Sequence, residues 1–432
     1  MKRRDFLGSS SLLAVGAAAG FSPDPAWTPF PVETQQPALP PSIAALTSQR
    51  ERIRPITKDE RRGRIEQAKT LMAKSGIGAL FLTGGSSLIY FSGIEWGLSE
   101  RLLALVIPVR GTPFIVCPAF ERDRAMEQVA QGPLDANTEI LTWEEHENPW
   151  ALCAKALRAR GLGTARIGIE ETVRWVFSDG LARELPQARL VSGTPISAGC
   201  RMVKDAHELE LMILANELTL TAYEAAWKAI TPGMTAGELS RLIAVAHERL
   251  GVRGGASVQT GEFAALPHGS IQPQVIREGT IILIDGGCSA GGYASDISRT
   301  FVIGTPTDKM QRVFDLEFKA QQAALAAAKP GVPAEQVDAV ARKVIEAGGY
   351  GPGYRFFTHR VGHGMGMDGH EWPYLVKGNT VPLEKGNVFS DEPGIYLPGE
   401  FGVRLEDDMY ITDDGAKFMT PASRSLTEPF AR

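Results

Sequence analysis

The sequence has little of what several classes of protein require. Its four cysteines lie far apart and form no C-x-x-C pair, so neither a disulfide framework nor a thiolate zinc site is expected. It has no Lys/Arg-rich patch interleaved with aromatic residues, which argues against a nucleic-acid partner. No run beyond the N-terminus approaches the roughly 18 apolar residues that a membrane-spanning helix needs, so stable membrane insertion is not expected.

Two enzyme classes also lack their signatures. There is no G-x-S-x-G elbow and no phosphate-binding glycine loop, which argues against a serine hydrolase and a nucleotide-binding protein. The content of hydrophobic residues (44%) and charged residues (22%) is ordinary for a globular protein. A length of 432 residues exceeds one typical core and predicts two domains.

The N-terminus has a composition of its own. Paired arginines in K-R-R-D-F-L (residues 2–7) precede an apolar stretch and a run of alanines. This pattern resembles a twin-arginine export signal over residues 1–21, which implies a periplasmic protein. Residues 22–54 follow with seven prolines before position 43 and little periodicity, which predicts a linker or extended arm.

The rest of the chain predicts an α/β (α+β) protein with a first domain over 55–195 and a second over 196–432. Short apolar runs at 78–82, 102–107, 113–117 and 166–169 are typical of buried strands, and 59–75 and 151–160 of helices between them. Apolar residues at helical spacing predict a long helix over 205–230. Thr235 and Glu238 match a capping box for the next helix. Further strands are expected at 281–285, 300–303 and 408–412.

Residues suited to chemistry concentrate between positions 260 and 410. The apolar run 281–284 ends in Asp285, and a buried aspartate is costly unless it is paired, hydrogen-bonded or bound to a metal. Asp296 begins the next strand, so a hairpin would bring the two carboxylates together. Three more motifs follow: G-H-G-M-G with His363, S-D-E-P-G-I-Y with Glu392, and G-V-R-L-E-D with Glu406.

Each of these residues also has an ordinary structural explanation. An aspartate in D-G-G is usually a turn former, and Glu392 and Glu406 could be surface or ion-paired residues. Together, however, four carboxylates and one imidazole form an oxygen-rich donor set that suits a pair of divalent ions. Carboxylates can bridge two cations and offset their charge. The ordered set therefore predicts a two-metal site.

This order of motifs resembles the "pita-bread" metallopeptidases, the creatinase/aminopeptidase family that includes aminopeptidase P and prolidase. The resemblance covers roughly residues 200–425, and residues 55–195 fit the creatinase-like N-terminal domain more loosely. It implies a C-terminal pita-bread catalytic domain that holds two divalent ions, manganese first and cobalt, zinc or iron as alternatives. It also implies the metal ligands Asp285, Asp296, His363, Glu392 and Glu406.

The resemblance implies further roles at the site. Glu392 would move a proton to the leaving nitrogen, and His268 and His370 would contact the substrate carbonyl or the oxyanion formed from it. His359 matches a pocket position in aminopeptidase P, with a packed histidine as the alternative. Arg404 lies two positions before Glu406, so on a strand it shares that ligand's face and could orient the site, bind substrate or form an ordinary ion pair.

The implied reaction is hydrolysis of the Xaa-Pro bond at the N-terminus of a peptide or in a dipeptide. Some prolidases carry an arginine directly after H-E-x-P, where this chain has Tyr374, which weakly disfavours a strict dipeptidase. Two alternatives stay open: the same fold acting on other amides or esters, and a metal-free binding module. Relatives of this kind imply a homo-oligomer, either a dimer or a tetramer.

Overall fold

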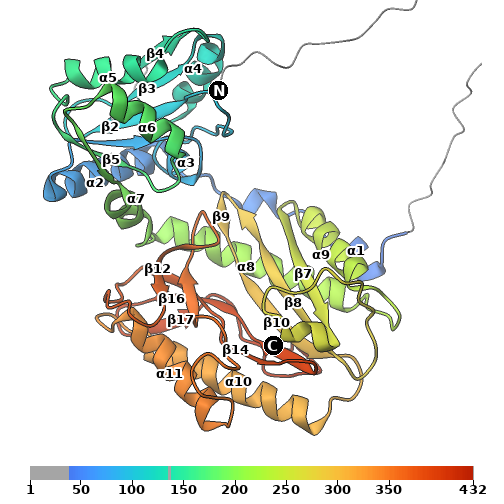
Figure 1. The fold of residues 1–432 in the computed structure, drawn as a ribbon. Coiled ribbons are helices and arrows are strands. Elements are labelled where there is room, and N and C mark those ends of the chain that lie inside the picture. Colours follow the sequence, from blue (N-terminus) through green and yellow to red (C-terminus); the bar gives the residue numbers. More distant parts are fainter. Residues whose placement is uncertain (1–37, 135–137, 432) are drawn as a thin grey trace, which may run out of the picture. The chain divides into compact units, whose positions relative to one another are not determined.

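The computed structural model describes residues 38–134 and 138–431 (Figure 1). The predicted export signal over residues 1–21 lies outside the described residues. Of the proline-rich segment, residues 38–54 are described, and they hold α1 (Pro41–Ala44) and the 3₁₀ turn η1 (Arg50–Arg52). Ile43 is fully buried, and α1 contacts α8 and α9. This part of the segment is a packed element, whereas its composition predicted a linker or extended arm.

A six-stranded sheet in the order β4-β3-β2-β1-β5-β6 organises the first domain. The central strands β1, β2 and β3 read as continuous apolar runs because core side chains cover both faces of the sheet there. The strands are β1 (Ala79–Leu82), β2 (Ala104–Pro108), β3 (Phe114–Pro118), β4 (Glu139–Trp143), β5 (Arg166–Ile169) and β6 (Arg189–Ser192). The helices are α2 (Lys58–Ser75), α3 (Ser86–Ser92), η2 (Ala119–Glu121), α4 (Arg122–Gln131), α5 (Pro149–Ala159), α6 (Trp175–Glu184) and α7 (Thr194–Arg201).

The helix α7 connects the two domains along the chain. Ile196 and Cys200 are buried in the core that also contains strands β1 to β3, so α7 packs as part of the first domain. The chain then enters α8 (Ala206–Trp227) and α9 (Ala236–Leu250). The capping box predicted at Thr235 and Glu238 is confirmed, and Asp205 forms a second one with Glu208 at the start of α8.

Three further sheets form the second domain. Their orders are β10-β8-β7 with β9 beside β8, β12-β11-β13-β16-β17, and the pair β14-β15. The helices α8 and α9 contact the first of these sheets, and α10 (Asp308–Ala327) and α11 (Ala334–Ala347) contact the second (Figure 1). The strands and the remaining turn are β7 (Arg253–Thr260), η3 (Gly261–Ala265), β8 (Ile281–Ala290), β9 (Tyr293–Ala294), β10 (Ile297–Val302), β11 (Gly362–Gly364), β12 (Glu371–Leu375), β13 (Val388–Asp391), β14 (Gly394–Leu397), β15 (Phe401–Arg404), β16 (Asp407–Ile411) and β17 (Ala416–Phe418).

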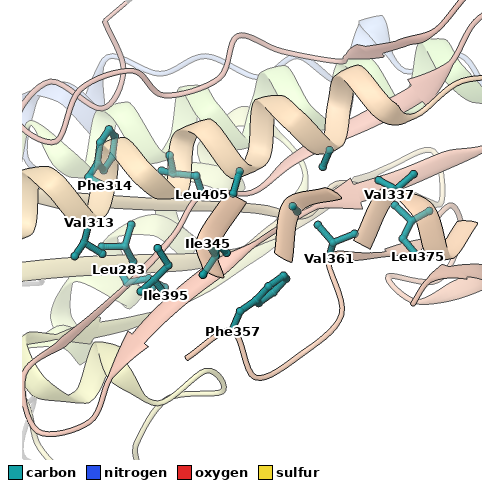
Figure 2. Close-up of a cluster of buried hydrophobic side chains, with 14 of the residues drawn as sticks. Leu283, Val313, Phe314, Val337, Ile345, Phe357, Val361, Leu375, Ile395 and Leu405 are labelled. Carbon is teal, nitrogen blue, oxygen red and sulfur yellow. The ribbon is translucent and has the colours of Figure 1, made fainter. Parts of the chain in front are cut away.

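The main core of the second domain lies between α10, α11 and the strands that carry the chemical motifs. Figure 2 shows apolar side chains from α10 (Val313, Phe314) and α11 (Val337, Ile345) together with Leu283, Ile395 and Leu405. Leu405 directly precedes the candidate ligand Glu406, and Leu283 lies two residues before Asp285. Packing of these apolar neighbours therefore fixes the backbone on which the polar side chains stand.

The mixed α/β organisation predicted from the sequence is confirmed. Among the described residues, the structure contains no helix that is both long and apolar enough to cross a bilayer. Homo-oligomerisation and export stay predictions.

Candidate metal centre

The β8–β10 hairpin brings the first two candidate ligands together. Ser298 pairs directly with Asp285 in this antiparallel ladder, and Asp296 stands just before β10. The prediction that the strand ends at Asp285 was wrong, because β8 continues to Ala290 through pairing with β7 and β9. Asp285 thus projects from within a strand paired on both sides, which holds its carboxylate more firmly than a turn would.

Glycines in the two small-residue motifs allow the backbones to approach closely. A Cβ on Gly287 would overlap the carbonyl oxygen of Ser295, next to Asp296. A Cβ on Gly362 would overlap the carbonyl oxygen of Ser390, two residues before Glu392. A side chain at either position would push apart the segments that carry two candidate ligands.

His363 presents one ring nitrogen to the acidic side chains. Its Nδ1 lies 3.2 Å from the carbonyl oxygen of Gly364, an acceptor, so the proton of the neutral ring resides on Nδ1. Its Nε2 then carries the lone pair and lies 3.4 Å from Glu392 Oε1 and 3.9 Å from Asp296 Oδ2. Burial lowers the pKa of His363 to about 3, with a smaller effect from His370. This neutral, oriented imidazole has the form of a metal ligand.

Two glutamates complete the set from neighbouring strands. Glu392 follows β13, and Glu406 stands between β15 and β16, where it forms an isolated bridge with Ser298. Asp391 and Asp407 pair directly across β13 and β16, so both glutamates emerge at the same end of these strands. The fold therefore gathers carboxylates that lie more than 100 positions apart in the sequence.

The donor atoms form three overlapping groups, each with all its atoms within 4.8 Å of one another. The groups are Asp285/Asp296/Glu406, His363/Glu392/Glu406, and Asp296/His363/His370. The first two contain all five predicted ligands and share Glu406. All of these residues line a single cleft.

The electrostatics of the cleft favour bound cations. Burial raises the pKa of Asp296 and Glu406 well above the ordinary carboxyl range, and the neighbouring carboxylates add to the shift. Burial likewise raises the pKa of Glu392 to about 7. Burial and neighbouring carboxylates both disfavour the ionised form of these groups, so positive charge is needed nearby to keep them ionised. A pair of divalent cations, which prefer oxygen ligands and one imidazole, fits this donor set.

Arg404 brings positive charge from the protein to the acidic side chains of this site. Its guanidinium is buried, forms an ion pair with Asp285 at 2.7 Å and donates to the Ser298 hydroxyl at 2.9 Å. The same hydroxyl lies 2.8 Å from Asp285 Oδ1 and 2.7 Å from Glu406 Oε2. The sequence reasoning did not identify Ser298, although it lies two positions after Asp296 and shares its face of the strand.

The remaining predicted residues line the same cleft. His370 is exposed and stacks on His363 with ring centroids 3.8 Å apart. His268 lies at the exposed rim of the cleft. His359 is half-buried, with Nε2 2.7 Å from the Tyr396 hydroxyl, and burial lowers its pKa to about 4. All the predicted site residues thus come together, while their individual roles stay predictions.

Arg360 is a further cleft residue that the sequence reasoning missed. Its Nη2 lies 3.2 Å from His370 Nδ1, and its guanidinium covers the ring of Tyr374, 4.2 Å from the centroid. An arginine only donates, so His370 accepts at Nδ1, and the proton of its neutral ring sits on Nε2. Its position in H-R-V-G-H, between the predicted site residues His359 and His363, is the sequence feature that could have indicated it.

Comparisons with known proteins agree with this geometry. The profile of Metallopeptidase family M24 matches residues 210–413, and that of the Creatinase/Prolidase N-terminal domain matches residues 64–203. The chain is 34% identical to Xaa-Pro dipeptidase of Lactobacillus helveticus over 80% of its own length and 93% of that protein. The solved structure of dipeptidase PepE from Mycobacterium ulcerans has a TM-score of 0.80 at 32% identity, covering 87% of this chain and 98% of that one. Prolidase from Thermococcus sibiricus has a TM-score of 0.77 at 30% identity, covering 85% and 98%.

The expected creatinase-like and pita-bread domains are therefore confirmed, and with them a peptidase that depends on metal. The chain belongs to metallopeptidase family M24.

Proposed function

We propose that this protein is a dinuclear metal-dependent exopeptidase that hydrolyses the Xaa-Pro bond, with a preference for dipeptides. The observation that carries the proposal is the convergence of Asp285, Asp296, His363, Glu392 and Glu406 in overlapping donor groups within one cleft. The relatives named Xaa-Pro dipeptidase and prolidase support the choice of substrate.

The residues of the cleft supply the groups that amide hydrolysis needs. Bound divalent cations would polarise the scissile carbonyl and activate a water molecule. Glu392 faces both His363 and His359, at 3.4 Å and 3.9 Å, and is placed to accept the proton of that water. It then delivers the proton to the leaving nitrogen while the hydroxyl group stays on the carbonyl carbon, so the water is divided between the two products.

His370 has the orientation of a hydrogen-bond donor to the substrate. Because Arg360 occupies its Nδ1, the Nε2–H is free to donate to the carbonyl oxygen as negative charge develops there. His268, on the rim of the same cleft, is placed for a similar contact. His359 is held by Tyr396 and contributes to the wall of the pocket.

Arg360 favours a dipeptide as the substrate. It lines the cleft, and among the described residues its side chain contacts His370 and the Tyr374 ring rather than a carboxylate. A dipeptide places its free C-terminal carboxylate close to the scissile bond, within the same small space. Tyr374 occupies the position where some prolidases carry an arginine, yet the guanidinium of Arg360 lies over that tyrosine's ring. The cleft thus has a cation for this carboxylate despite the tyrosine in the motif.

Arg360→Met is expected to raise KM for an Xaa-Pro dipeptide by about 10–100-fold, since a hydrogen bond to a charged group contributes about 1.5–3 kcal/mol. KM for the same dipeptide with an amidated C-terminus should change by less than about threefold, because the amide has no charge to pair with the arginine. Any loss of kcat through the contact between Arg360 and His370 should be equal for the two forms. Steady-state kinetics on the acid and amide forms measures both. Arg355→Met, which removes an exposed arginine on the same segment, is the matched control. An equal rise in KM for the acid and amide forms of the dipeptide would exclude Arg360 as the partner of the substrate carboxylate.

The proposed function itself is tested with purified protein reconstituted with manganese, cobalt or zinc. We expect turnover of Xaa-Pro dipeptides, slower cleavage of longer Xaa-Pro peptides and little activity on matched dipeptides without proline. Hydrolysis confined to non-proline amides or esters would favour another substrate class. Absence of activity on every Xaa-Pro peptide, together with less than one bound metal equivalent, would favour a binding module.

A further inference from the structure

The hairpin turn that carries His370 is held by side chains from outside the cleft. Glu371, the residue after His370, is buried and forms an ion pair with Arg201, and its other oxygen lies 3.4 Å from Lys204 Nζ. Asp368, two residues before His370, lies 2.6 Å from the same Arg201 Nη2. We call Arg201, Lys204, Asp368 and Glu371 the four-residue clamp.

The clamp is anchored in the first domain. Arg201 ends α7 and donates through Nη1 to the Ser87 hydroxyl at 3.1 Å, and Ser87 in turn donates to Glu170 at 2.8 Å. Ser86 donates to Asp368. The amide of Asp368 also donates to Glu371 Oε1 at 2.9 Å, which closes the turn on itself. One arginine and one lysine thus neutralise the two acidic groups that flank His370.

This arrangement constrains the catalytic histidine from both sides. Glu371 begins β12, and successive side chains of an extended chain point to opposite faces. Fixing Glu371 on the clamp side therefore directs His370 toward the cleft, where it stacks on His363. His370 itself is exposed, so burial does not fix it. Its position depends on its neighbours.

We propose that Arg201, assisted by Lys204, is a positioning residue for His370 that acts through Glu371 and Asp368. This inference rests on the proposed function, because it concerns the histidine assigned to the substrate carbonyl. It gives the first domain a part in catalysis, although no first-domain residue is among those that line the metal cleft. Among the described residues, the polar partners of Arg201 are Ser87, Asp368 and Glu371, and none of them is a candidate metal ligand.

The test is a double-mutant cycle of Arg201→Met with His370→Ala. In the wild-type background we expect Arg201→Met to lower kcat by about 10–100-fold, as loss of an orienting partner does elsewhere. KM and the bound metal equivalents should stay near their wild-type values. In the His370→Ala background the same substitution should lower kcat by less than about threefold, because the group that it positions is gone.

A matched control separates positioning from loss of structure. Arg64 is another buried first-domain arginine, 3.2 Å from Glu208 and 2.9 Å from the Tyr293 hydroxyl, and it does not touch the clamp. Arg64→Met should lower the melting temperature and leave kcat within about threefold. Arg201→Lys, which keeps one ion pair, should recover part of the lost kcat. Glu371→Gln replaces Arg201→Met in the cycle if the latter does not fold.

The proposal would be overturned if Arg201→Met lowered kcat equally in the wild-type and His370→Ala backgrounds. It would also be overturned if Arg201→Met and Arg64→Met lowered kcat equally. Failure of the proposed function is a separate outcome, in which the wild-type protein cleaves no Xaa-Pro peptide. In that case, crystal structures of the wild-type protein and of Arg201→Met test whether the clamp positions His370. His370 displaced from His363 only in the variant would support it, and unchanged stacking would overturn it.

Discussion

Glu406→Gln is expected to lower kcat/KM for an Xaa-Pro dipeptide by about 10³-fold or more and to reduce bound metal below two equivalents. Glu406 belongs to two of the three donor groups, one with Asp285 and Asp296 and the other with His363 and Glu392. The amide keeps the shape of the side chain but loses its charge and offers one oxygen in place of two. It therefore cannot serve both groups at once.

Kinetics and elemental analysis of the same protein sample measure the two effects of Glu406→Gln together. Glu400→Gln is the matched control, since Glu400 is half-exposed and pairs with Lys309 away from the cleft. That variant should keep full activity and metal content. Two metal equivalents and undiminished turnover in Glu406→Gln would show that this carboxylate does not join the two donor groups.

Arg404→Met is expected to destabilise the metal-free protein by about 3–5 kcal/mol. Arg404 is 4% exposed, and its guanidinium pairs with Asp285 and donates to the Pro267 carbonyl and the Tyr396 hydroxyl, both at 3.0 Å. Its removal leaves Asp285 without its cationic partner in a cleft already crowded with carboxylates. The cost of breaking a buried pair exceeds the net stabilisation of the pair, because one charge is left behind.

The metal dependence of this loss distinguishes a charge effect from a packing effect. Saturating manganese supplies positive charge beside Asp285, so the difference in unfolding free energy between Arg404→Met and wild type should narrow. Urea unfolding with and without manganese measures it. Arg183→Met, which breaks an exposed pair with Asp179, should change stability by less than about 0.5 kcal/mol under both conditions. A loss below about 1 kcal/mol in metal-free Arg404→Met would contradict the prediction.

Local signals in the sequence predicted the features that depend on near neighbours. Apolar runs located β1, β3 and β8 because these strands are buried, and the Thr235/Glu238 box located the start of α9. The order of the motifs, through its resemblance to a known family, predicted the five candidate ligands, and each motif combines a donor with the glycines or strand formers that place it. These are properties of a few consecutive residues.

Features that depend on distant contacts escaped the sequence reasoning. The continuation of β8 past Asp285 depends on pairing with β7, whose residues precede it by some thirty positions. The role of Arg360 depends on its contacts with the Tyr374 ring and with His370, residues 14 and 10 positions away, and their proximity is not evident from the sequence. The ion pair between Arg201 and Glu371 joins residues 170 positions apart. Glu371 belongs to H-E-x-P, but nothing around Arg201 in the sequence indicates its partner.

The distribution of the donor groups along the chain has a consequence for folding. Glu406 reaches Asp285 and Asp296 only after β10, β13 and β16 have paired. A partly folded polypeptide in which these strands have not yet paired cannot present the complete set of donors. Any cation that needs the whole set therefore binds the native state in preference to the unfolded one, and its binding energy adds to the cooperativity of the second domain.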